Sequence, residues 1–290
     1  MNLLIRADSS STIGLGHIMR DLVLAQQYPH AHITFACQNL VGNIIDKIPY
    51  PVHILRTNEP EELINSITSL KINMVIFDHY DIDYSFEKKI KEATHITIMS
   101  LDDTYNSHYC DILLNHNISA DENRYKDLLP VHCELHCGKD YTLIRDEFRS
   151  EKEISREKIY DIFISMGGTD SSNITLDILK SIPCSKKVCL ATTTSNPNLN
   201  TLLTYTLKST QIKIHLNSNE IAKLLHQSHL AIITPSVMVH EVLFMEMPFI
   251  AIQTASNQDD IVQYLHKHNF CILNEFEATQ FQKQLQRFLP

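Results

Sequence analysis

The chain begins with two closely spaced glycines followed directly by a histidine. Gly14, Gly16 and His17 lie in RADSSSTIGLGHIMR (6–20), although the 290 residues include only six glycines. Glycine is used where the backbone takes a positive φ angle or closely approaches another group. Histidine titrates near neutral pH and is the most frequent general base. A lone histidine is more often a core or surface residue, but this spacing favours a ligand loop with His17 as a base.

A second glycine pair occupies the corresponding place in the second half of the chain. Gly167 and Gly168 follow the apolar run YDIFIS (160–165). Each pair stands between an expected strand and an expected helix, whose N-terminal amides favour an anion. A single pair could serve only to shorten a turn, but matching pairs favour binding. The first loop is no dinucleotide fingerprint, because Met19 replaces the third glycine and the P-loop Lys-Ser/Thr is absent.

A third candidate loop lies in ITPSVMVHEVLFMEMP (233–248). Its Thr-Pro-Ser sequence ends a strand and predicts a helix with a cap and an N-terminal proline. The first turn, with Ser236 and Val237, offers amides to a diphosphate. Glu241 follows about one and a half turns later, where it suits the two hydroxyls of a ribose. Without these surroundings Glu241 would be interpreted as a solvated helix residue.

Short apolar runs alternate with amphipathic stretches along the chain. Expected strands are 2–5, 32–37, 51–55, 74–80, 96–101, 110–115, 160–165, 186–192, 212–216, 229–234 and 249–253. Expected helices include 17–28, 60–70, 173–182, 219–225 and 237–246. This alternation predicts an α/β protein with doubly wound parallel sheets.

The charged stretch 144–160 interrupts the alternation. We therefore expect two Rossmann-like lobes, 1–148 and 149–290, with a cleft between them. Ligands of such sheets bind at the carboxyl ends of the strands, where the candidate loops lie. The segment 274–290 is a candidate for a last helix that returns to the first lobe.

Composition excludes several classes of function. The net charge is −9, without a run of Lys or Arg, which argues against a nucleic-acid partner. Nothing resembles a signal peptide, and no apolar run approaches the roughly 18 residues of a membrane span. Seven irregularly spaced cysteines predict a reducing cytoplasm rather than a disulfide framework. We expect a cytoplasmic monomer.

Two segments contain residue types that bind metals. Asp81 and Asp83 resemble the DxD motif of another transferase fold, but we interpret them as a solvated loop. HCELHC (132–137) alternates like a strand, whereas compact zinc motifs usually come as two separated pairs. We expect no metal.

Several acidic residues near strand ends are open candidates for assisting His17. Asp102 and Asp103 end an expected strand, and Asp8 lies at the end of the first strand together with Arg6. Arg6 and Asp8 could orient the loop or touch substrate, and the sequence leaves this open.

These motifs together resemble a known family. SMGGTD…N (165–173), the Ser-Val-x-Val-x-Glu helix (236–241) and ASNQ (255–258) resemble the nucleotide-binding lobe of GT-B glycosyltransferases, notably the lipid II-forming transferase. With residues 6–25 and DHY (78–80), the resemblance covers nearly the whole chain. It is closest to the UDP-2,4-diacetamido-2,4,6-trideoxy-β-L-altropyranose hydrolases of pseudaminic acid biosynthesis. One departure is Pro235-Ser236, where GT-B helices usually begin with Ser-Gly.

The resemblance implies a UDP-sugar substrate, attack of water at the anomeric carbon, C–O cleavage, release of UDP and inversion. His17 would accept the proton of the water, opposite the leaving group. Because a terminal phosphate has a second pKa of roughly 6, the leaving group needs little acid catalysis, and no cofactor is expected. The expected substrate-binding positions are Gly14, Gly16, Tyr80, Gly167, Gly168, Asn173, Ser236, Val237, Glu241 and Asn257.

Two alternatives remain open at this point. A GT-B glycosyltransferase would use the same nucleotide lobe but would need an acceptor. A nucleotide-sugar-binding protein without turnover would not need His17 as a base.

Overall fold

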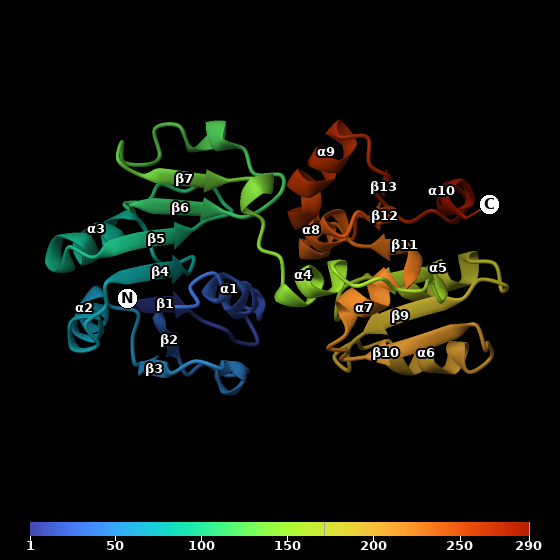
Figure 1. Ribbon diagram of the computed structural model, residues 1–290, viewed down its shortest axis with the longest axis horizontal. Helices are drawn as coiled ribbons and strands as arrows, with labels where there is room; N and C mark the ends of the chain where they lie inside the picture. Colours follow the sequence, from blue (N-terminus) through green and yellow to red (C-terminus); the bar gives the residue numbers. More distant parts are fainter. Residues whose placement is uncertain (171, 290) are drawn as a thin grey trace. The chain divides into compact units, whose positions relative to one another are not determined.

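The computed structural model describes residues 1–170 and 172–289. The chain divides into two compact units, Met1–Leu143 and Ile144–Pro290, each built on one parallel sheet (Figure 1). The division falls slightly before the boundary expected at 148. The reason is that Ile144 and Phe148 pack into the core of the second unit.

The first unit contains a seven-stranded parallel sheet in the order β3-β2-β1-β4-β5-β6-β7. Its strands are β1 (Asn2–Ala7), β2 (His32–Gln38), β3 (Val52–Leu55), β4 (Met74–Asp78), β5 (Thr97–Leu101), β6 (Ile112–Asn115) and β7 (Glu134–Cys137). Its helices are α1 (Gly16–Gln26), α2 (Pro60–Ser69) and α3 (Tyr84–Thr94), and short 3-10 helices span Ile45–Lys47, Glu122–Tyr125 and Lys139–Tyr141.

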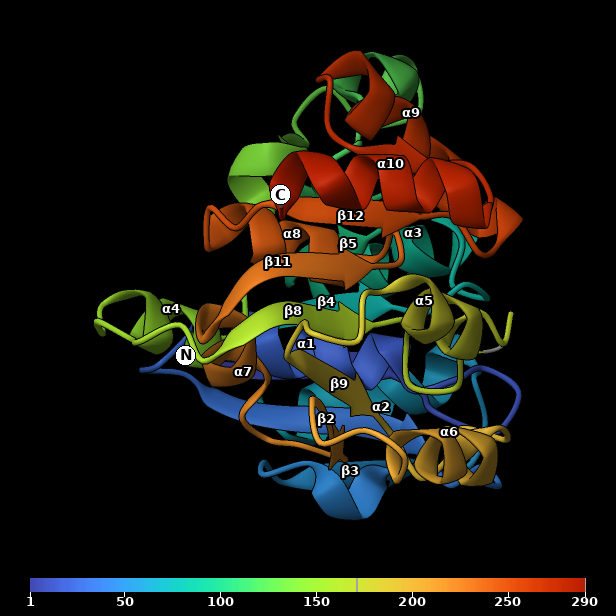
Figure 2. The ribbon, with the colours of Figure 1, turned by 90° about the vertical axis from the view of Figure 1, so that its right-hand side faces the viewer.

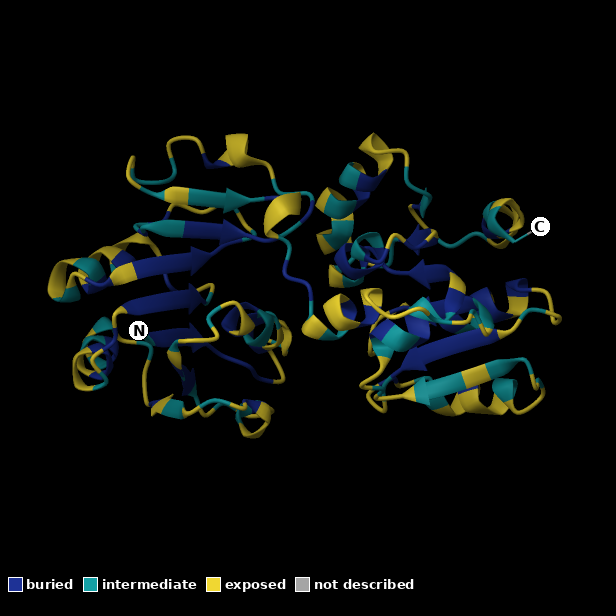
Figure 3. Cartoon of the chain, in the orientation of Figure 1, coloured by how far each residue is buried: buried dark blue, intermediate teal, exposed yellow. Residues whose placement is uncertain are grey.

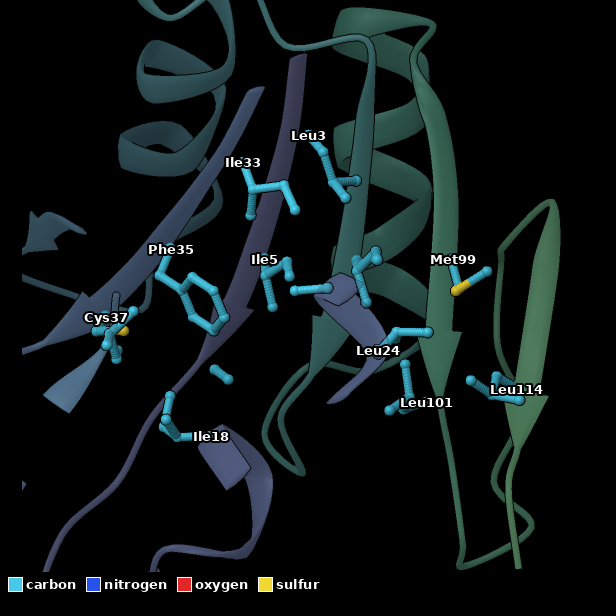
Figure 4. Close-up of a cluster of buried hydrophobic side chains, with 14 of the residues drawn as sticks. Leu3, Ile5, Ile18, Leu24, Ile33, Phe35, Cys37, Met99, Leu101 and Leu114 are labelled. Carbon is cyan, nitrogen blue, oxygen red and sulfur yellow. The ribbon is translucent and has the colours of Figure 1, made fainter. Parts of the chain in front are cut away.

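This sheet is buried on both faces, as parallel sheets usually are. Successive side chains of a strand point to opposite faces, so β1 contributes to two clusters. Leu3 and Ile5 pack in one cluster with Ile18 and Leu24 of α1, which point toward the sheet (Figure 4). Leu4 packs in the other cluster, which also includes buried residues of α2 and α3. Figure 3 shows the central strands of each unit as buried, whereas the edge strands β7 (Glu134–Cys137) and β10 (Ile212–Leu216) are intermediate or exposed.

The second unit contains six strands among its described residues, in the order β10-β9-β8-β11-β12-β13. They are β8 (Tyr160–Ser165), β9 (Val188–Thr192), β10 (Ile212–Leu216), β11 (Ser228–Ile233), β12 (Phe249–Ile252) and β13 (Ile272–Leu273). The helices are α4 (Asp146–Lys152), α5 (Thr175–Ser181), α6 (Leu199–Thr206), α7 (Ile221–His226), α8 (Val237–Phe244), α9 (Asp259–Lys267) and α10 (Ala278–Phe288), with a 3-10 turn at Ser256–Gln258.

The last helix, α10, packs within the second unit (Figure 2). Phe281 and Leu285 are buried in the same cluster as the sheet residues, and Gln282 donates a hydrogen bond to the carbonyl of Ser181. The expectation that the segment 274–290 returns to the first lobe is therefore wrong; its last residue, Pro290, lies outside the described residues. The amphipathic pattern predicted a helix but contained no information about which sheet it covers.

Both sheets reverse their strand order beside their first strand. β1 lies between β2 and β4, and β8 lies between β9 and β11. The strands of each sheet run parallel, so their carboxyl ends, drawn as arrowheads in Figure 1, meet at one edge. Ligands of open α/β sheets bind outside such a reversal. The doubly wound α/β fold predicted from the sequence is confirmed, and no helix in the described part of the chain is long and apolar enough to cross a bilayer.

Candidate active site

His17 lies in the first turn of α1, directly after the loop that follows β1. Within this loop Ser10 and Gly14 pair through their backbones, and Gly14 takes a φ of +85° that favours glycine. The Gly14 amide donates to the Ser10 carbonyl at 2.9 Å. The expectation that this amide contacts an anion is therefore not supported, and the loop instead sets the start of the helix. His17 is 7% exposed.

The His17 ring contacts the last residue of β4. Its Nδ1 lies 2.7 Å from Oδ1 of Asp78, which is almost fully buried. The contact exists because β4 pairs with β1, so that Asp78 stands opposite Ala7 at the carboxyl edge of the sheet. His17 and Asp78 therefore meet at the place where the strand order of this sheet reverses.

Arg20 holds the other side of the Asp78 carboxylate. Its Nε donates to Oδ2 at 2.6 Å, and its Nη2 contacts Oδ1 and lies 3.1 Å from Nδ1 of His17. Burial alone would raise the pKa of Asp78, but Arg20 and His17 outweigh burial and hold this pKa well below its usual range. Asp78 is therefore a carboxylate at neutral pH.

Tyr80 extends this cluster toward solvent. Its ring meets the His17 ring edge-on at 4.8 Å, and its hydroxyl donates to Asp103 at 3.1 Å. Asp103 also accepts a hydrogen bond from Arg20 at 2.9 Å. Burial, with Asp103 adding to it, raises the pKa of Tyr80 to about 12, so the phenol keeps its proton at neutral pH. Tyr80, at 61% exposed, is the accessible member of the group.

The structure separates the three acidic candidates for assisting His17. Asp103 joins the cluster through Arg20 and Tyr80. Asp8 instead accepts two hydrogen bonds from the buried Arg6 and contacts His79. Asp102 accepts hydrogen bonds from its own loop, at Thr104 and Tyr105, and from Tyr125.

Asp78, Arg20 and the neighbouring Asp21 are residues that sequence reasoning missed. His17, Arg20 and Asp21 are spaced by three and four residues, which places them on one side of α1. Asp78 belongs to the DHY motif, but its contact with His17 depends on β4 lying next to β1. Helical spacing was the only local signal that could have indicated part of this group.

In the second unit, the glycine loop after β8 is tied to the loop after β9. Gly167 has a φ of +83°. The carbonyl of Gly168 accepts a hydrogen bond from Oγ1 of Thr193 at 2.7 Å, and a Cβ at Gly168 would meet the Thr193 methyl at 3.1 Å. Asn173 is exposed with a φ of +54°. Its backbone N–H donates a hydrogen bond to the backbone carbonyl of Asp170.

The start of α8 lies beside this loop, because β11 pairs with β8. Ser236 is the N-cap residue, but its side chain makes no cap hydrogen bond, and Pro235 precedes the cap instead of occupying the first helical position. The sequence expectation of an N-terminal proline and a side-chain cap is wrong on both points. Val237 opens the helix and is 47% exposed.

The loop containing Asn257 is held against the end of β11. The Gln258 amide donates to Oγ1 of Thr234 at 2.8 Å and accepts from the Thr254 backbone at 2.9 Å. Asn257 itself is exposed. The carboxyl edge of this sheet therefore brings Ser236 and Asn257 together on adjacent loops.

Glu241 is not the solvated helix residue that one of the two sequence-based interpretations described, because it is only 1% exposed. Both of its oxygens accept hydrogen bonds from Arg145, at 2.6 and 2.9 Å. Burial raises the pKa of Glu241 despite this partner.

The two segments considered for metals have other roles in the structure. Asp83 caps α3 by accepting from the Phe86 amide at 2.9 Å, while Asp81 is exposed. The last four residues of HCELHC, Glu134–Cys137, form the strand β7 that the alternation predicted. Over residues 1–170 and 172–289, no group of three or more His, Cys, Asp or Glu side chains is arranged to hold a metal.

Known structures define the class of fold. The MurG structure of Acinetobacter baumannii aligns over 100% of this chain and 90% of its own, with a TM-score of 0.64 and 11% identity. Anabaena Alr3699/HepE, solved with UDP-glucose, aligns over 99% and 89%, with a TM-score of 0.59. At such low identity these matches establish only the fold, which is the GT-B fold with two Rossmann-like units. No protein-family model matches the chain.

Relatives with similar sequences identify the family, whereas the solved structures identify only the fold. The UDP-2,4-diacetamido-2,4,6-trideoxy-beta-L-altropyranose hydrolase of Campylobacter jejuni is 44% identical over 270 residues, covering 93% of this chain and 98% of the relative. The chain belongs to this hydrolase family. The spore coat polysaccharide biosynthesis protein SpsG of Bacillus subtilis is 21% identical over 269 residues, covering 89% and 79%.

Proposed function

We propose that the protein hydrolyses UDP-2,4-diacetamido-2,4,6-trideoxy-β-L-altropyranose to 2,4-diacetamido-2,4,6-trideoxy-L-altrose and UDP. Membership of the hydrolase family supports the substrate and the reaction. Water attacks the anomeric carbon, the C–O bond to the diphosphate breaks, and the configuration inverts. The oxygen of water enters the sugar, and its protons pass to the base and the product hydroxyl.

His17 is the proposed general base. The observation that carries this assignment is its environment: Nδ1 faces the carboxylate of Asp78 at 2.7 Å, which leaves Nε2 as the nitrogen that can accept a proton from water. Tyr80, at the exposed edge of the same cluster, is assigned to bind the sugar.

The second unit is the proposed UDP-binding unit. Its glycine loop, with Gly167, Gly168 and Asn173, and the start of α8, with Ser236 and Val237, offer amides at adjacent strand ends. The diphosphate is assigned to these amides, with Asn257 on the neighbouring loop. In the first unit, Gly16 at the start of α1 is assigned to substrate binding through its backbone amide.

Glu241 is assigned to the ribose hydroxyls. A carboxylate offers about four lone-pair sites, so a hydroxyl can donate to it while Arg145 remains bound. Because Glu241 is only 1% exposed, this contact requires a local movement at the start of α8.

The decisive experiment combines substrate turnover with an isotope label. Wild-type protein in ¹⁸O-water is expected to release free sugar containing the label and unlabelled UDP, without any acceptor and equally with EDTA. His17→Ala is expected to keep its affinity for UDP and to lose turnover by about 100-fold or more. Unchanged turnover in His17→Ala would refute the base assignment.

The same assay separates the alternatives. A glycosyltransferase would release no free sugar until an acceptor is added. A nucleotide-sugar-binding protein would bind UDP without turnover, and His17→Ala would leave its function intact.

We further propose that the reaction belongs to pseudaminic acid biosynthesis and flagellin glycosylation, and that the protein is a cytoplasmic monomer. The seven cysteines are free thiols, which supports a reducing compartment. Sedimentation of the purified protein and fractionation of cells test the monomer and the location. Loss of the pathway product in a deletion strain tests the pathway.

A further inference from the structure

Asp21 is a buried carboxyl group that the proposed reaction does not use. It lies on α1 four residues after His17 and is 0% exposed. Among the described residues, neither of its oxygens has a hydrogen-bond partner. An ionised carboxylate without partners is very costly in such surroundings, so a group of this kind retains its proton.

We propose that Asp21 and Asp78 form an unequal pair next to His17, in which Asp21 keeps a proton and Asp78 carries the charge that fixes the His17 tautomer. Asp78 is then a positioning residue, because it acts on the reaction only through the imidazole. This inference rests on the proposed role of His17 as the base.

The His17 tautomer follows from the contact with Asp78. Two acceptor atoms repel each other at 2.7 Å, so a proton lies between Nδ1 of His17 and Oδ1 of Asp78. Asp78 is ionised, so that proton lies on Nδ1. A neutral imidazole with a proton on Nδ1 has its free lone pair on Nε2, which is the form that a general base requires.

Arg20 makes the two carboxyl groups unequal. Its guanidinium donates to both oxygens of Asp78 and to Asp103, whereas in the described part of the chain it makes no hydrogen bond to Asp21. Burial and the nearby charge of Asp78 both raise the pKa of Asp21, while Arg20 opposes them only in part. Neighbouring carboxyl groups rarely ionise together, so the group with the cation takes the charge.

Among the described residues, Arg20 is the cation that acts on the Asp21 carboxyl group. The charged and titratable groups of the cluster are His17 and Arg20 on α1, Asp78 and Tyr80 at and after β4, and Asp103 after β5. The neighbouring groups toward β1 and β2 are Arg6, Asp8 and Cys37, of which Arg6 is bound to Asp8.

Asp78→Asn tests the first half of the proposal. Arg20 can only donate, so it takes the amide oxygen and leaves the amide NH₂ facing Nδ1 of His17. His17 then becomes protonated on Nε2 and loses its function as a base. The expected result is a fall in kcat of at least about 100-fold with KM close to the wild-type value, as when the orienting Asp of a protease triad becomes Asn.

Histidine-labelled protein gives a readout that does not depend on turnover. The long-range ¹⁵N–¹H spectrum is expected to show His17 protonated on Nδ1 in the wild type and on Nε2 in Asp78→Asn. Asp81→Asn is the matched control, because Asp81 is an exposed carboxylate outside this cluster. It is expected to retain wild-type kcat and the wild-type spectrum.

Asp21→Asn tests the second half of the proposal, namely that the Asp21 carboxyl group keeps its proton. The infrared spectrum of the wild type at neutral pH is expected to contain a band of a protonated carboxylic acid that disappears in Asp21→Asn and persists in Asp81→Asn. A wild-type spectrum without that band would overturn the assignment of Asp21.

The outcomes separate this inference from the proposed function. If His17→Ala is inactive while folded Asp78→Asn keeps full kcat or the Nδ1 tautomer, the base assignment stands and the Asp78 inference fails. If His17→Ala retains turnover, the base assignment fails whichever tautomer is seen.

Discussion

Arg145 and Glu241 form a bidentate ion pair within the second unit, with Nε 2.6 Å from Oε1 and Nη2 2.9 Å from Oε2. Glu241 is buried, whereas the Arg145 side chain is 34% exposed. Arg145 precedes α4 and Glu241 lies in α8, so the pair links the first helix of this unit to the helix of the proposed diphosphate site.

Loss of this pair is expected to destabilise the second unit. Arg145→Ala leaves the Glu241 carboxylate buried without a cation, and the expected loss in free energy of unfolding is about 2 kcal/mol after allowance for the partial exposure of Arg145. Urea denaturation followed by circular dichroism measures it. Arg149→Ala, an exposed substitution in α4, is the control and is expected to change stability by less than about 0.5 kcal/mol. Equal stability of the two variants would contradict the role of the pair.

His108 predicts a fall in stability at alkaline pH. Its Nδ1 lies 2.7 Å from Glu87 and its Nε2 lies 3.9 Å from Asp102. Burial lowers the pKa of His108, but these two carboxylates outweigh burial and raise it to about 9. A raised histidine pKa stabilises the folded state below the unfolded value of roughly 6.5, and this contribution is lost as the pH rises toward 9.

The expected size of this loss is on the order of 2 kcal/mol between pH 6.5 and 9. Urea denaturation at several pH values measures it. The His108→Gln variant is expected to show a flatter dependence over the same interval. A wild-type dependence identical to that of His108→Gln would show that the ion pairs of His108 contribute nothing.

The strands could be predicted from the sequence because parallel strands buried on both faces are continuous apolar runs. All eleven expected strands coincide with observed ones, as at Tyr160–Ser165, where the bounds are identical. Several helices were harder to recognise. In α3 the buried residues are Glu87 and Ile90, so a polar residue interrupts the apolar stripe. The helix α4 lies inside the charged stretch that was interpreted as an interruption.

The candidate site could be predicted only where its signal is local. His17 was recognisable because two glycines precede it within three residues of sequence. Its partner Asp78 is 61 residues away, and Arg145 is 96 residues from Glu241. Both contacts depend on which elements become neighbours in the fold. A local pattern contains no information of that kind, so the sequence indicated the proposed base His17 but neither of these ion-pair partners.

Asp83 and Asp81 are expected to differ in their effect on stability, although they stand two residues apart. Asp83 caps α3 through the Phe86 amide, and replacing such a cap by alanine costs about 1 kcal/mol. Asp81 is exposed, so Asp81→Ala is expected to change stability by less than about 0.5 kcal/mol. Thermal denaturation of both variants measures the difference. If a divalent metal stabilised the wild type and neither variant, the two residues would instead form a cation site.

Gly14 and Gly16 provide a matched pair of substitutions in the loop before His17. A Cβ at either position meets no atom within 4 Å, so steric overlap does not distinguish them. Gly14 has a φ of +85°, whereas Gly16 is the first residue of α1 and has no positive φ. Gly14→Ala is therefore expected to cost about 1 kcal/mol of stability through backbone strain, and Gly16→Ala to be neutral or slightly stabilising.

The same pair separates the geometry of the loop from its stability. If the loop sets the position of His17, Gly14→Ala is also expected to lower kcat, with the affinity for UDP little changed. Gly16→Ala keeps its backbone amide, so it is expected to retain both kcat and affinity for UDP. Stability, kcat and UDP affinity measured on each variant show whether the loop conformation positions His17 or only stabilises the protein. A larger loss of stability in Gly16→Ala than in Gly14→Ala would show that backbone strain at position 14 does not govern this loop.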